Sequence, residues 1–302
     1  MIQLMEKIIK EKLGGRVGRV DLPLRFLKFS TAGSGRGAYN KVIFLVFKNN
    51  AKEPFVCVKT VRQYSDRHTI SNAFCNLSEL NKLVQGSTYE EMFPGALYLY
   101  DDGHYTIFSV ETACPGIRAD NNRKTLRSIL DQYFDFQKYL SDKASGSICD
   151  LYQYGLDVIK ELDFTKGDQQ EISDYFKNLF RRGNVRGVKT VPQHGDLTLD
   201  NIFLKNKKIG VVDCDFFGVI KLAGFDVFHL LARCNNNGFV KYYKEYFREY
   251  FDAIGESISV EPHVIFLYCL HDFVFKRSKS LKYLSTKTII DYFEKFLINH
   301  GT

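Results

Sequence analysis

The stretch from His194 to Asn201, with the sequence His-Gly-Asp-Leu-Thr-Leu-Asp-Asn, constrains this chain more than any other. A short apolar run, Ile209 to Val212, follows it and leads directly into Asp213-Cys214-Asp215. The first stretch offers a carboxylate that can accept a proton and, five residues later, an amide oxygen, and the second offers a carboxylate at the end of a strand. Metal-assisted phosphoryl transfer to an alcohol requires these groups.

Each of these side chains has a predicted role in that chemistry. Asp196 is the candidate base, because a carboxylate within reach of a hydroxyl can orient it and take its proton. Asn201 and Asp213 are candidate ligands of Mg²⁺, a hard cation that prefers oxygen atoms. Asp213 follows the apolar strand directly and is preferred over Asp215, which is either a second ligand or a cap of the turn. His194 is expected to hold the loop through side-chain hydrogen bonds.

A glycine-rich segment lies between two β-rich runs near the N-terminus. The runs are Leu24 to Ser30 and Lys41 to Phe47, and Gly33, Gly35 and Gly37 lie between them. Glycines allow a backbone to fold closely over a phosphate and to point N–H groups at it. A dinucleotide-binding fold would open a helix after its glycines, so that fold is disfavoured. Taken alone, such a segment is more often only a hairpin turn.

A lysine near the end of the next predicted strand is the candidate cation. Lys59 lies in the apolar strand Phe55 to Val61, where a charged side chain is costly unless an anion meets it. The alternative is a strand-edge lysine that reaches solvent. Helical spacing over Ser71 to Val84 follows, and its Glu79 either forms an ion pair with Lys59 or is a solvated helix charge.

The second half of the chain is predicted to be mainly helical. Two more strands, Ala96 to Tyr100 and Tyr105 to Val110, lead into Glu111 to Gly116, where Pro and Gly end the strand. The boundary between two domains is therefore expected there, giving residues 1–112 and 113–302. Helices are expected over Thr125 to Leu140, Leu151 to Leu162, Gln170 to Phe180, Val227 to Ala232, Phe239 to Ile254, Pro262 to Phe275 and Thr288 to Ile298.

Composition limits the class of protein and its partners. With 302 residues and 45% hydrophobic residues, the chain can build a large core, and no apolar run reaches the length of a membrane-spanning helix. The seven cysteines are scattered without any C-x-x-C pair, which predicts reduced thiols and a cytoplasmic protein. The net charge of +7 is spread among acidic residues, so neither a nucleic-acid nor a membrane partner is expected.

The motifs together resemble those of the aminoglycoside phosphotransferase and choline kinase-like superfamily. The matching residues are His194-Gly195-Asp196 with Asn201, then Val212-Asp213, then Phe225-Asp226-Val227 at the start of a helix. Cys214 departs from the pattern, because an aromatic residue is frequent at that position. The resemblance implies an α+β, two-lobed protein-kinase-like fold, with a small N-lobe built on an antiparallel sheet and a larger, mainly helical C-lobe.

The resemblance also implies ligands and roles for single residues. ATP, or another nucleoside triphosphate, would bind with Mg²⁺ near Glu111 and under the loop from Gly33 to Gly37. Lys59 matches the lysine that contacts nucleotide phosphates, and Glu79 matches its helix partner. Asp226 matches an aspartate that braces the backbone of the catalytic loop.

The leading hypothesis is therefore an ATP- and Mg²⁺-dependent phosphotransferase that acts on a hydroxyl of a small molecule. Sugars or sugar-containing precursors are favoured, because Lys276, Arg277, Lys279 and Lys282 occur with few acids, unlike the acid-rich pockets that suit polycationic antibiotics. Aminoglycosides and choline-like amino alcohols stay open as acceptors. The alternative is a catalytically silent, nucleotide-binding scaffold, which would have no need to keep Lys59, Asp196, Asn201 and Asp213.

Overall fold

The computed structural model describes residues 1–18, 20, 23–30, 41–144, 147–161, 165–183, 187–234, 243–257, 261–271, 290–291 and 293–294. The chain forms two compact units. Unit 1 comprises Met1–Ala119 and Asp200–Phe217, and unit 2 comprises Asp120–Leu199 and Gly218–Thr302. The sequence analysis expected two continuous domains that meet after residue 112, whereas unit 1 is made of two separate segments, the first of which ends at Ala119.

Unit 1 is built on an antiparallel sheet with the strand order β1-β2-β3-β5-β4. The expected strands are confirmed with shifts of one or two residues at their ends. Their bounds are β1 Leu24–Ser30, β2 Lys41–Lys48, β3 Val56–Val61, β4 Ala96–Asp101 and β5 Ile107–Thr112.

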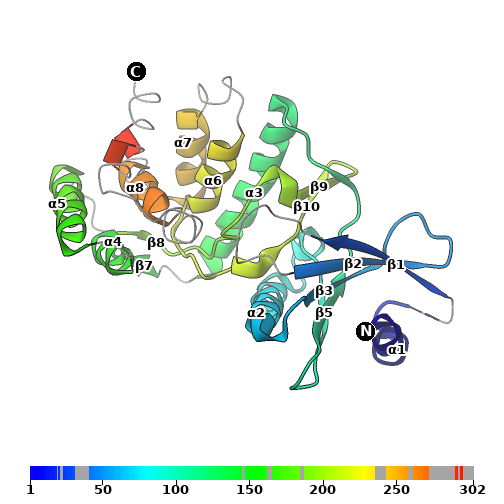
Figure 1. The fold of residues 1–302 in the computed structure, drawn as a ribbon. Coiled ribbons are helices and arrows are strands. Elements are labelled where there is room, and N and C mark those ends of the chain that lie inside the picture. The colour runs from blue at the N-terminus through cyan, green and yellow to red at the C-terminus, as the bar shows by residue number, and fades with distance from the viewer. Residues whose placement is uncertain are drawn as a thin grey trace. The chain divides into compact units, whose positions relative to one another are not determined.

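One face of this sheet packs against helix α1 (Ile2–Leu13), as Figure 1 shows. Side chains alternate across a strand, so every second residue of β2 and β3 points to this face. The apolar core of this face joins residues of the helix and of the sheet: Met5, Ile8, Ile9, Leu13, Val42, Phe44, Val46, Val56, Val58, Phe108 and Val110. Burial of these side chains holds α1 on the sheet.

The opposite face of the sheet carries the predicted lysine. Cross-strand pairing aligns Phe29 with Ile43, Ile43 with Lys59 and Lys59 with Ser109. The neighbouring row aligns Leu27, Leu45, Cys57 and Glu111. Directly opposed residues share a face, so the register alone places Lys59 and Glu111 on the face that α1 leaves uncovered.

Helix α2 (Arg67–Val84) packs against β3, β4 and β5. It begins four residues before the expected start at Ser71 and ends as expected. Asn81 fixes it to the sheet, because its amide nitrogen donates to the carbonyl of Pro94 at 2.9 Å and its oxygen accepts from the backbone of Ala96 at 2.7 Å.

A smaller sheet explains why unit 1 extends past the expected boundary. Strand β6 (Ile117–Arg118) pairs with β9 (Ile202–Lys205), and β9 pairs with β10 (Lys208–Val211). At Gly210 a Cβ atom would lie 2.3 Å from the sulfur of Cys114, so any other residue there would require Cys114 to move.

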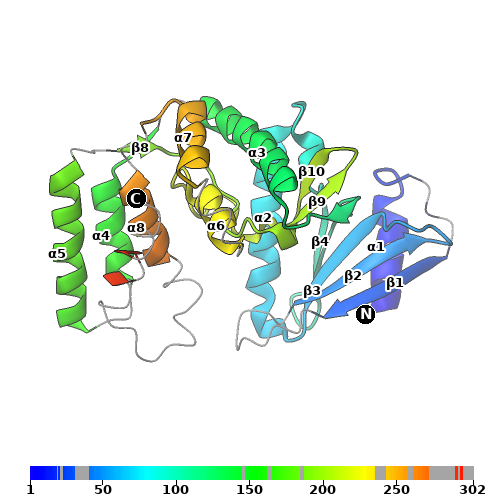
Figure 2. The ribbon, with the colours of Figure 1, turned by 90° about the horizontal axis from the view of Figure 1, so that it is seen from above.

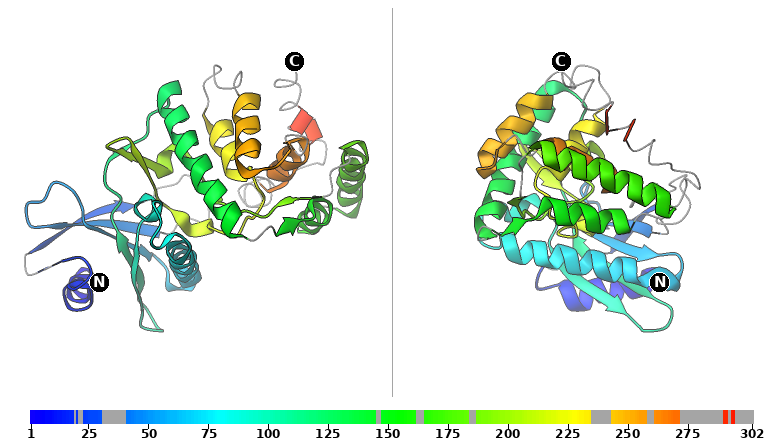
Figure 3. Two further views of the ribbon diagram at one scale, coloured as in Figure 1. Left: turned by 180° about the vertical axis from the view of Figure 1, so that it is seen from behind. Right: turned by 90° about the vertical axis from the view of Figure 1, so that its left-hand side faces the viewer.

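Unit 2 is mainly helical and carries one short two-stranded sheet, β7 (Ile148–Cys149) with β8 (Val188–Lys189). Helix α3 packs against α7, and α6 packs against both α7 and α8. Helices α5, α4 and α8 stand side by side in Figure 2, and Figure 3 shows the α4 and α5 pair from a second direction. The helix bounds are α3 Arg123–Lys143, α4 Leu151–Lys160, α5 Lys166–Gly183, α6 Phe225–Arg233, α7 Tyr243–Ile254 and α8 Glu261–His271.

These helices confirm the predicted helical half of the chain, with differences at their ends. The described part of the expected helix Pro262 to Phe275 ends at His271, and most of the expected helix Thr288 to Ile298 lies outside the described residues. Among the helices that the structure describes, none is both long and apolar enough to cross a membrane.

Candidate active site

Helix α6 braces the loop that carries the candidate base. The carboxylate of Asp226, in the first turn of α6, accepts hydrogen bonds from the backbone N–H groups of His194 at 2.5 Å and Gly195 at 2.8 Å. The hydroxyl of Tyr133 also donates to this buried carboxylate. Burial and the negative charge of Asp226 together raise the pKa of Tyr133, which keeps the phenol a donor. The expected bracing role of Asp226 is confirmed.

The loop itself needs glycine at its second position. Gly195 has a φ of +83°, a backbone conformation that L side chains rarely adopt. Its neighbour His194 is buried, and its Nδ1 accepts a hydrogen bond from the backbone N–H of Asp196 at 3.3 Å. This contact agrees with the structural role expected for His194.

The Asp196 side chain is held by a histidine that sequence reasoning missed. His229 lies three residues after Asp226 on α6, and its Nε2 lies 3.2 Å from Oδ1 of Asp196. Its Nδ1 lies 2.9 Å from the hydroxyl of Tyr268 on α8. The carboxylate of Asp196 keeps a side-chain exposure of 28% while His229 is fully buried. The carboxylate is therefore oriented from one side and open to solvent on another.

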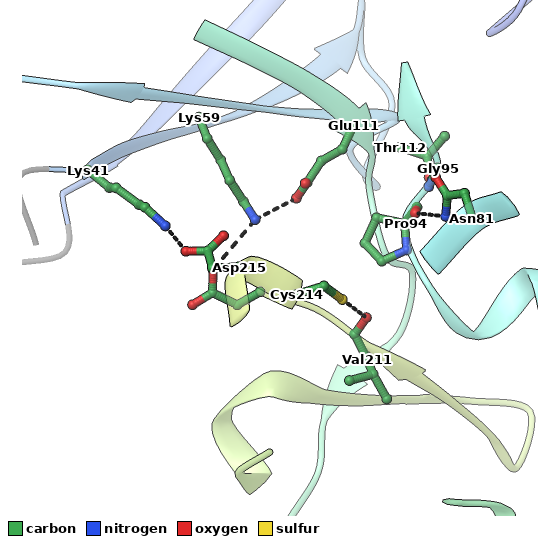
Figure 4. A network of polar contacts seen from close by, with 11 residues as sticks. Lys41, Lys59, Asn81, Pro94, Gly95, Glu111, Thr112, Val211, Cys214 and Asp215 are labelled. Atoms are coloured by element: carbon green, nitrogen blue, oxygen red, sulfur yellow. Dashed lines mark hydrogen bonds and ion pairs between the residues drawn. The ribbon is translucent and has the colours of Figure 1, made fainter. Parts of the chain in front are cut away.

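In unit 1, the predicted lysine is buried and paired. Nζ of Lys59 lies 3.1 Å from Oε1 of Glu111, on the neighbouring strand β5, and 3.6 Å from Oδ1 of Asp213. Figure 4 shows Lys59 and Glu111 pointing toward each other from their strands. Burial opposes the charge of Lys59, but attraction by Glu111 and Asp213 exceeds this effect and raises the pKa of the lysine. Lys59 therefore stays cationic beside an acidic pair.

The predicted ion pair between Lys59 and Glu79 is wrong. Glu79 has a side-chain exposure of 65% and pairs instead with Lys82 at 2.6 Å. The reason is the rotation of α2, which buries Leu77 and Leu80 and thereby turns Glu79 outward. The buried acid that Lys59 needs comes from β5, where Glu111 faces it across the sheet.

Asn201 and Asp213 flank the same end of the β9-β10 hairpin. Ile202 pairs with Val211 at the last register position, and the N–H of Val212 donates to the carbonyl of Asn201 at 2.9 Å. Asp213 then adopts a left-handed conformation, with φ 64° and ψ 46°, which is uncommon for residues other than glycine but is tolerated by Asp and Asn. Its side chain is 42% exposed.

The oxygen donors of this hairpin end suit a hard cation. One amide oxygen and one carboxylate are too few to enclose an ion, and Mg²⁺ typically keeps several waters beside one or two carboxylates and the phosphates of a substrate. Among the described residues, no group of three His, Cys, Asp or Glu side chains is arranged to hold a metal ion. The donor set therefore fits an ion that nucleotide and water would complete.

Asp215 has a different environment from Asp213. Its carboxylate pairs with Lys41, the first residue of β2, and Figure 4 shows the two side chains meeting. Its carbonyl accepts a hydrogen bond from the amide of Asn76 on α2 at 2.6 Å. These partners tie the turn after β10 to the sheet and to α2. The intervening Cys214 is buried, and burial raises the pKa of its thiol, so it acts as a small core residue.

The remaining predicted residues are Gly33, Gly35 and Gly37, which lie outside the described residues. The strands on either side are described, and they present an apolar surface on the Lys59 face. Leu27 and Phe29 of β1 are 51% and 48% exposed there. These two side chains are on the same face of the sheet as Lys59, two strands away from it, and give that face an apolar end.

Lys41, His229 and Tyr268 are the site residues that sequence reasoning missed. In the sequence, Lys41 was noticeable only as the start of a strand. Because Lys41 precedes Ile43 by two residues and Ile43 pairs with Lys59, the side chain of Lys41 lies on the same face as Lys59. His229 does leave a signal in the sequence, because Asp226 and His229 are three apart and so share one face of a helix. Tyr268 leaves none, since its partner lies 39 residues away.

Comparison with known proteins agrees with this arrangement. Residues 128–258 match the model of a family described as Phosphotransferase enzyme family. Comparison with curated proteins gave no match.

Solved structures resemble the chain over most of its length. The GDP and kanamycin complex of APH(2")-IIia has a TM-score of 0.57 at 14% identity, over 95% of this chain and 97% of that one. A choline kinase from Cryptosporidium parvum Iowa II has a TM-score of 0.58 at 12% identity, over 100% and 96%. The aminoglycoside phosphotransferase APH(3'')-Id from Streptomyces rimosus, in complex with ADP and streptomycin, has a TM-score of 0.53 at 16% identity, over 91% and 100%.

These findings confirm the predicted α+β, protein-kinase-like fold and the predicted resemblance to the aminoglycoside phosphotransferase and choline kinase-like superfamily. The family match also supports the predicted class of enzyme, a phosphotransferase.

Proposed function

We propose that the protein transfers the γ-phosphate of ATP, in the presence of Mg²⁺, to a hydroxyl group of a sugar or a sugar-containing small molecule. The observation that carries this proposal is the environment of Lys59, a buried cation held by Glu111 and reaching a half-exposed Asp213. A purely structural ion pair would not need the second carboxylate. A site for phosphates and a metal ion needs both a fixed cation and an acidic group.

Nucleotide binding is assigned to the face of the unit 1 sheet that carries Lys59. The ammonium of Lys59 would contact phosphate oxygens, and the open apolar side chains of Leu27 and Phe29 would pack against the purine ring. The glycine loop from Gly33 to Gly37 joins the same two strands and would cover the phosphates. Similar structures are complexes with GDP and with ADP, so both ATP and GTP are to be tested as donors.

Asn201 and Asp213 would hold Mg²⁺, with Asp215 as the less favoured ligand. When bound, the ion would neutralise charge on the transferred phosphate and on the leaving diphosphate. The acceptor hydroxyl would give its proton to Asp196, whose carboxylate is oriented by His229 and whose loop is held by Asp226. In a loose phosphoryl-transfer transition state, orientation of this hydroxyl contributes more than basicity.

The acceptor class rests on the sequence rather than on a described pocket. The basic residues from Lys276 to Lys282, which disfavour polycationic acceptors, lie outside the described residues. All seven cysteines are free thiols, which supports a reducing compartment such as the cytoplasm.

The test is nucleotide turnover by the purified protein with Mg²⁺ and either ATP or GTP. A panel of sugars, choline-like amino alcohols and aminoglycosides would be offered, and the diphosphate product measured. We expect turnover with a member of the sugar group and a loss of at least about 100-fold in Asp196→Asn, without a change in nucleotide Kd. Asp200→Asn is the matched control, because Asp200 is exposed and pairs with Arg118 at the surface.

The same experiment separates the enzyme from a silent scaffold. If the protein is a scaffold, the wild type and Asp196→Asn would bind nucleotide with the same Kd, and neither would show turnover with any acceptor. That outcome would remove the proposed activity and leave nucleotide binding in place. Equal turnover in the wild type and in Asp196→Asn would remove only the assigned base.

A further inference from the structure

The chain of hydrogen bonds behind Asp196 runs through two side chains that are buried in unit 2. His229 has an exposure of 0% and Tyr268 of 1%. Nε2 of His229 lies 3.2 Å from Oδ1 of Asp196, and Nδ1 lies 2.9 Å from the Tyr268 hydroxyl. The chain therefore leads from the partly exposed carboxylate into the core between α6 and α8.

For a neutral His229, the chemistry of these groups sets the direction of each hydrogen bond. An ionised carboxylate can only accept, so Nε2 of His229 must carry a proton to make a favourable contact with Asp196. A neutral imidazole then has its lone pair on Nδ1, and that nitrogen accepts from the hydroxyl of Tyr268. The reverse tautomer would direct a lone pair of Nε2 at the carboxylate oxygen. Tyr268 thus selects the tautomer that presents an N–H to Asp196.

The surroundings of the imidazole are mainly aromatic, so its two polar contacts matter. The ring of Phe225 stacks on His229 with a centroid distance of 6.1 Å, and Phe228 lies 4.4 Å from Tyr268 in an edge-on arrangement. Polar groups in such a core are costly unless they are hydrogen-bonded. An apolar residue would fill this space at lower cost if the only requirement were to pack α6 against α8. The hydrogen-bonded pair of His229 and Tyr268 is therefore expected to orient the carboxylate of Asp196.

We propose that His229 is a positioning residue for Asp196 and that Tyr268 fixes the tautomer of His229. This inference rests on the proposed function and deepens it. The N–H of His229 holds Oδ1, so that Oδ2 is the oxygen that receives the proton of the acceptor hydroxyl. In the step, the hydroxyl O–H bond breaks and its proton goes to Oδ2, while the hydroxyl oxygen forms a bond to the γ-phosphorus. The bond from that phosphorus to the bridging oxygen breaks, and its electron pair leaves with the nucleoside diphosphate.

A second carboxylate, on α6, fixes the backbone of the loop that carries Asp196. Asp226, one helical turn before His229, fixes the backbone at His194 and Gly195. One helix thus sets both the position of the loop backbone and the orientation of the Asp196 side chain. A shift of α6 would disturb both together, which is why the test compares variants that keep the helix and change one hydrogen bond.

The first arm of the test measures turnover as a function of pH. His229→Leu removes the N–H, His229→Gln restores a donor on a side chain of similar length, and Tyr268→Phe leaves the tautomer unselected. His104→Gln, in an exposed turn, is the control. The probe is Mg·ATP with the best acceptor of the panel, or with water as acceptor where none is found.

We expect kcat to fall about 10- to 100-fold in His229→Leu with nucleotide Kd unchanged, because orientation of the base is lost. A hydrogen bond to the ionised form lowers the pKa of a carboxyl group, so the acidic limb of kcat/KM should move to higher pH by about one unit. His229→Gln should return the limb toward its original position. A purely structural histidine would lower stability in both variants and leave the limb where it was, and that result would overturn the proposal.

The second arm needs no activity. Long-range ¹H–¹⁵N correlation spectra distinguish the two neutral tautomers of histidine, and the His229 signals are assigned by their loss in His229→Gln. We expect the Nε2–H form in the wild type and a mixture of the two forms in Tyr268→Phe. An Nδ1–H form in the wild type would contradict the proposal even if the protein is an active kinase. Absence of turnover with every acceptor, together with the Nε2–H form, would instead count against the proposed function.

Discussion

The ammonium of Lys59 lies 3.1 Å from a carboxylate oxygen of Glu111, and both side chains are almost completely removed from solvent. The two residues belong to neighbouring antiparallel strands and to one face of the sheet. Because Asp213 approaches the same ammonium at 3.6 Å, the charge of Lys59 is shared between a buried acid and a half-exposed one. The buried partner holds the lysine in place, and the half-exposed partner lies where a ligand can compete with it.

Lys59→Met should destabilise unit 1, because it leaves the carboxylate of Glu111 buried without its counter-ion. Removing one member of a buried ion pair typically costs about 3–5 kcal/mol, because the other charge stays buried without compensation. The double variant Lys59→Met with Glu111→Leu should recover much of this loss. Glu79→Gln is the control, with an expected change within about 0.5 kcal/mol, because Glu79 is exposed. Equal unfolding midpoints in urea for the Lys59 and Glu79 variants would contradict this assignment.

Asp213→Asn and Asp215→Asn should differ in their dependence on Mg²⁺. Asparagine tolerates the left-handed backbone of Asp213, so this variant removes charge with little change of conformation. The free Mg²⁺ concentration for half-maximal turnover should rise at least about tenfold in Asp213→Asn. Asp215→Asn breaks the contact with Lys41 and should shift that concentration less. The opposite order in a Mg²⁺ titration would make Asp215 the main ligand.

The sequence predicted the strands of unit 1 well because their signals are local, and the loop from His194 to Asn201 was noticeable for the same reason. A continuous apolar run between two lysines indicates β2, and a mostly apolar run indicates β3. The order His194, Asp196, Asn201, Asp213 lies within one short stretch. The partner of Lys59 could not be predicted in the same way. Whether Glu79 or Glu111 meets the lysine depends on the rotation of α2 and on the pairing of β3 with β5, and neither is visible in residue spacing.

Distance along the chain sets the same limit for His229 and Tyr268. The pattern Asp226-x-x-His229 places two polar side chains on one face of α6, but it does not say what they face. The contact with Asp196 arises only when the loop and the helix pack, 33 residues apart in the chain. The two-segment composition of unit 1 could not be predicted for a related reason, since β6 pairs with the much later strand β9.

Gly155→Ala should destabilise unit 2 although alanine is the better helix former. A Cβ at this buried position of α4 would lie 2.1 Å from the ring of Phe176 and 2.9 Å from Leu267. Phe176 is itself buried and stacks on Tyr152 and Phe266, so its ring has little room to move. Overpacking of about 1–3 kcal/mol therefore outweighs a propensity gain of about 1 kcal/mol.

Gly167→Ala is the matched control for this variant. Gly167 lies in the exposed first turn of α5, and a Cβ there would approach only Thr165 at 3.8 Å. We expect this substitution to be neutral or to stabilise by up to about 1 kcal/mol. Urea unfolding of the two variants measures the difference. If Gly155→Ala were as stable as Gly167→Ala, the ring of Phe176 would have to adopt another conformation that removes the clash.

His271 should make the stability of the protein depend on pH between about 4 and 6.5. This buried histidine at the end of α8 contacts the hydroxyl of Tyr154 at 2.5 Å, and burial lowers its pKa from 6.5 to about 4. Between these two values the unfolded chain binds a proton that the folded chain does not. The free energy of unfolding therefore has its full value above about pH 6.5 and falls as the pH drops through this window. Below about pH 4 both the folded and the unfolded chain carry the proton, so the loss is complete and His271 adds no further pH dependence.

The size of this effect follows from the shift, because each pKa unit corresponds to about 1.4 kcal/mol and the total loss is about 3 kcal/mol. His271→Gln should remove it. The informative quantity is the difference between wild type and variant, measured by urea unfolding from pH 4 to pH 7, since carboxylates titrate in both proteins. His104→Gln, in an exposed turn, should keep the wild-type slope. A difference that stays constant over this range would show that folding does not shift the pKa of His271.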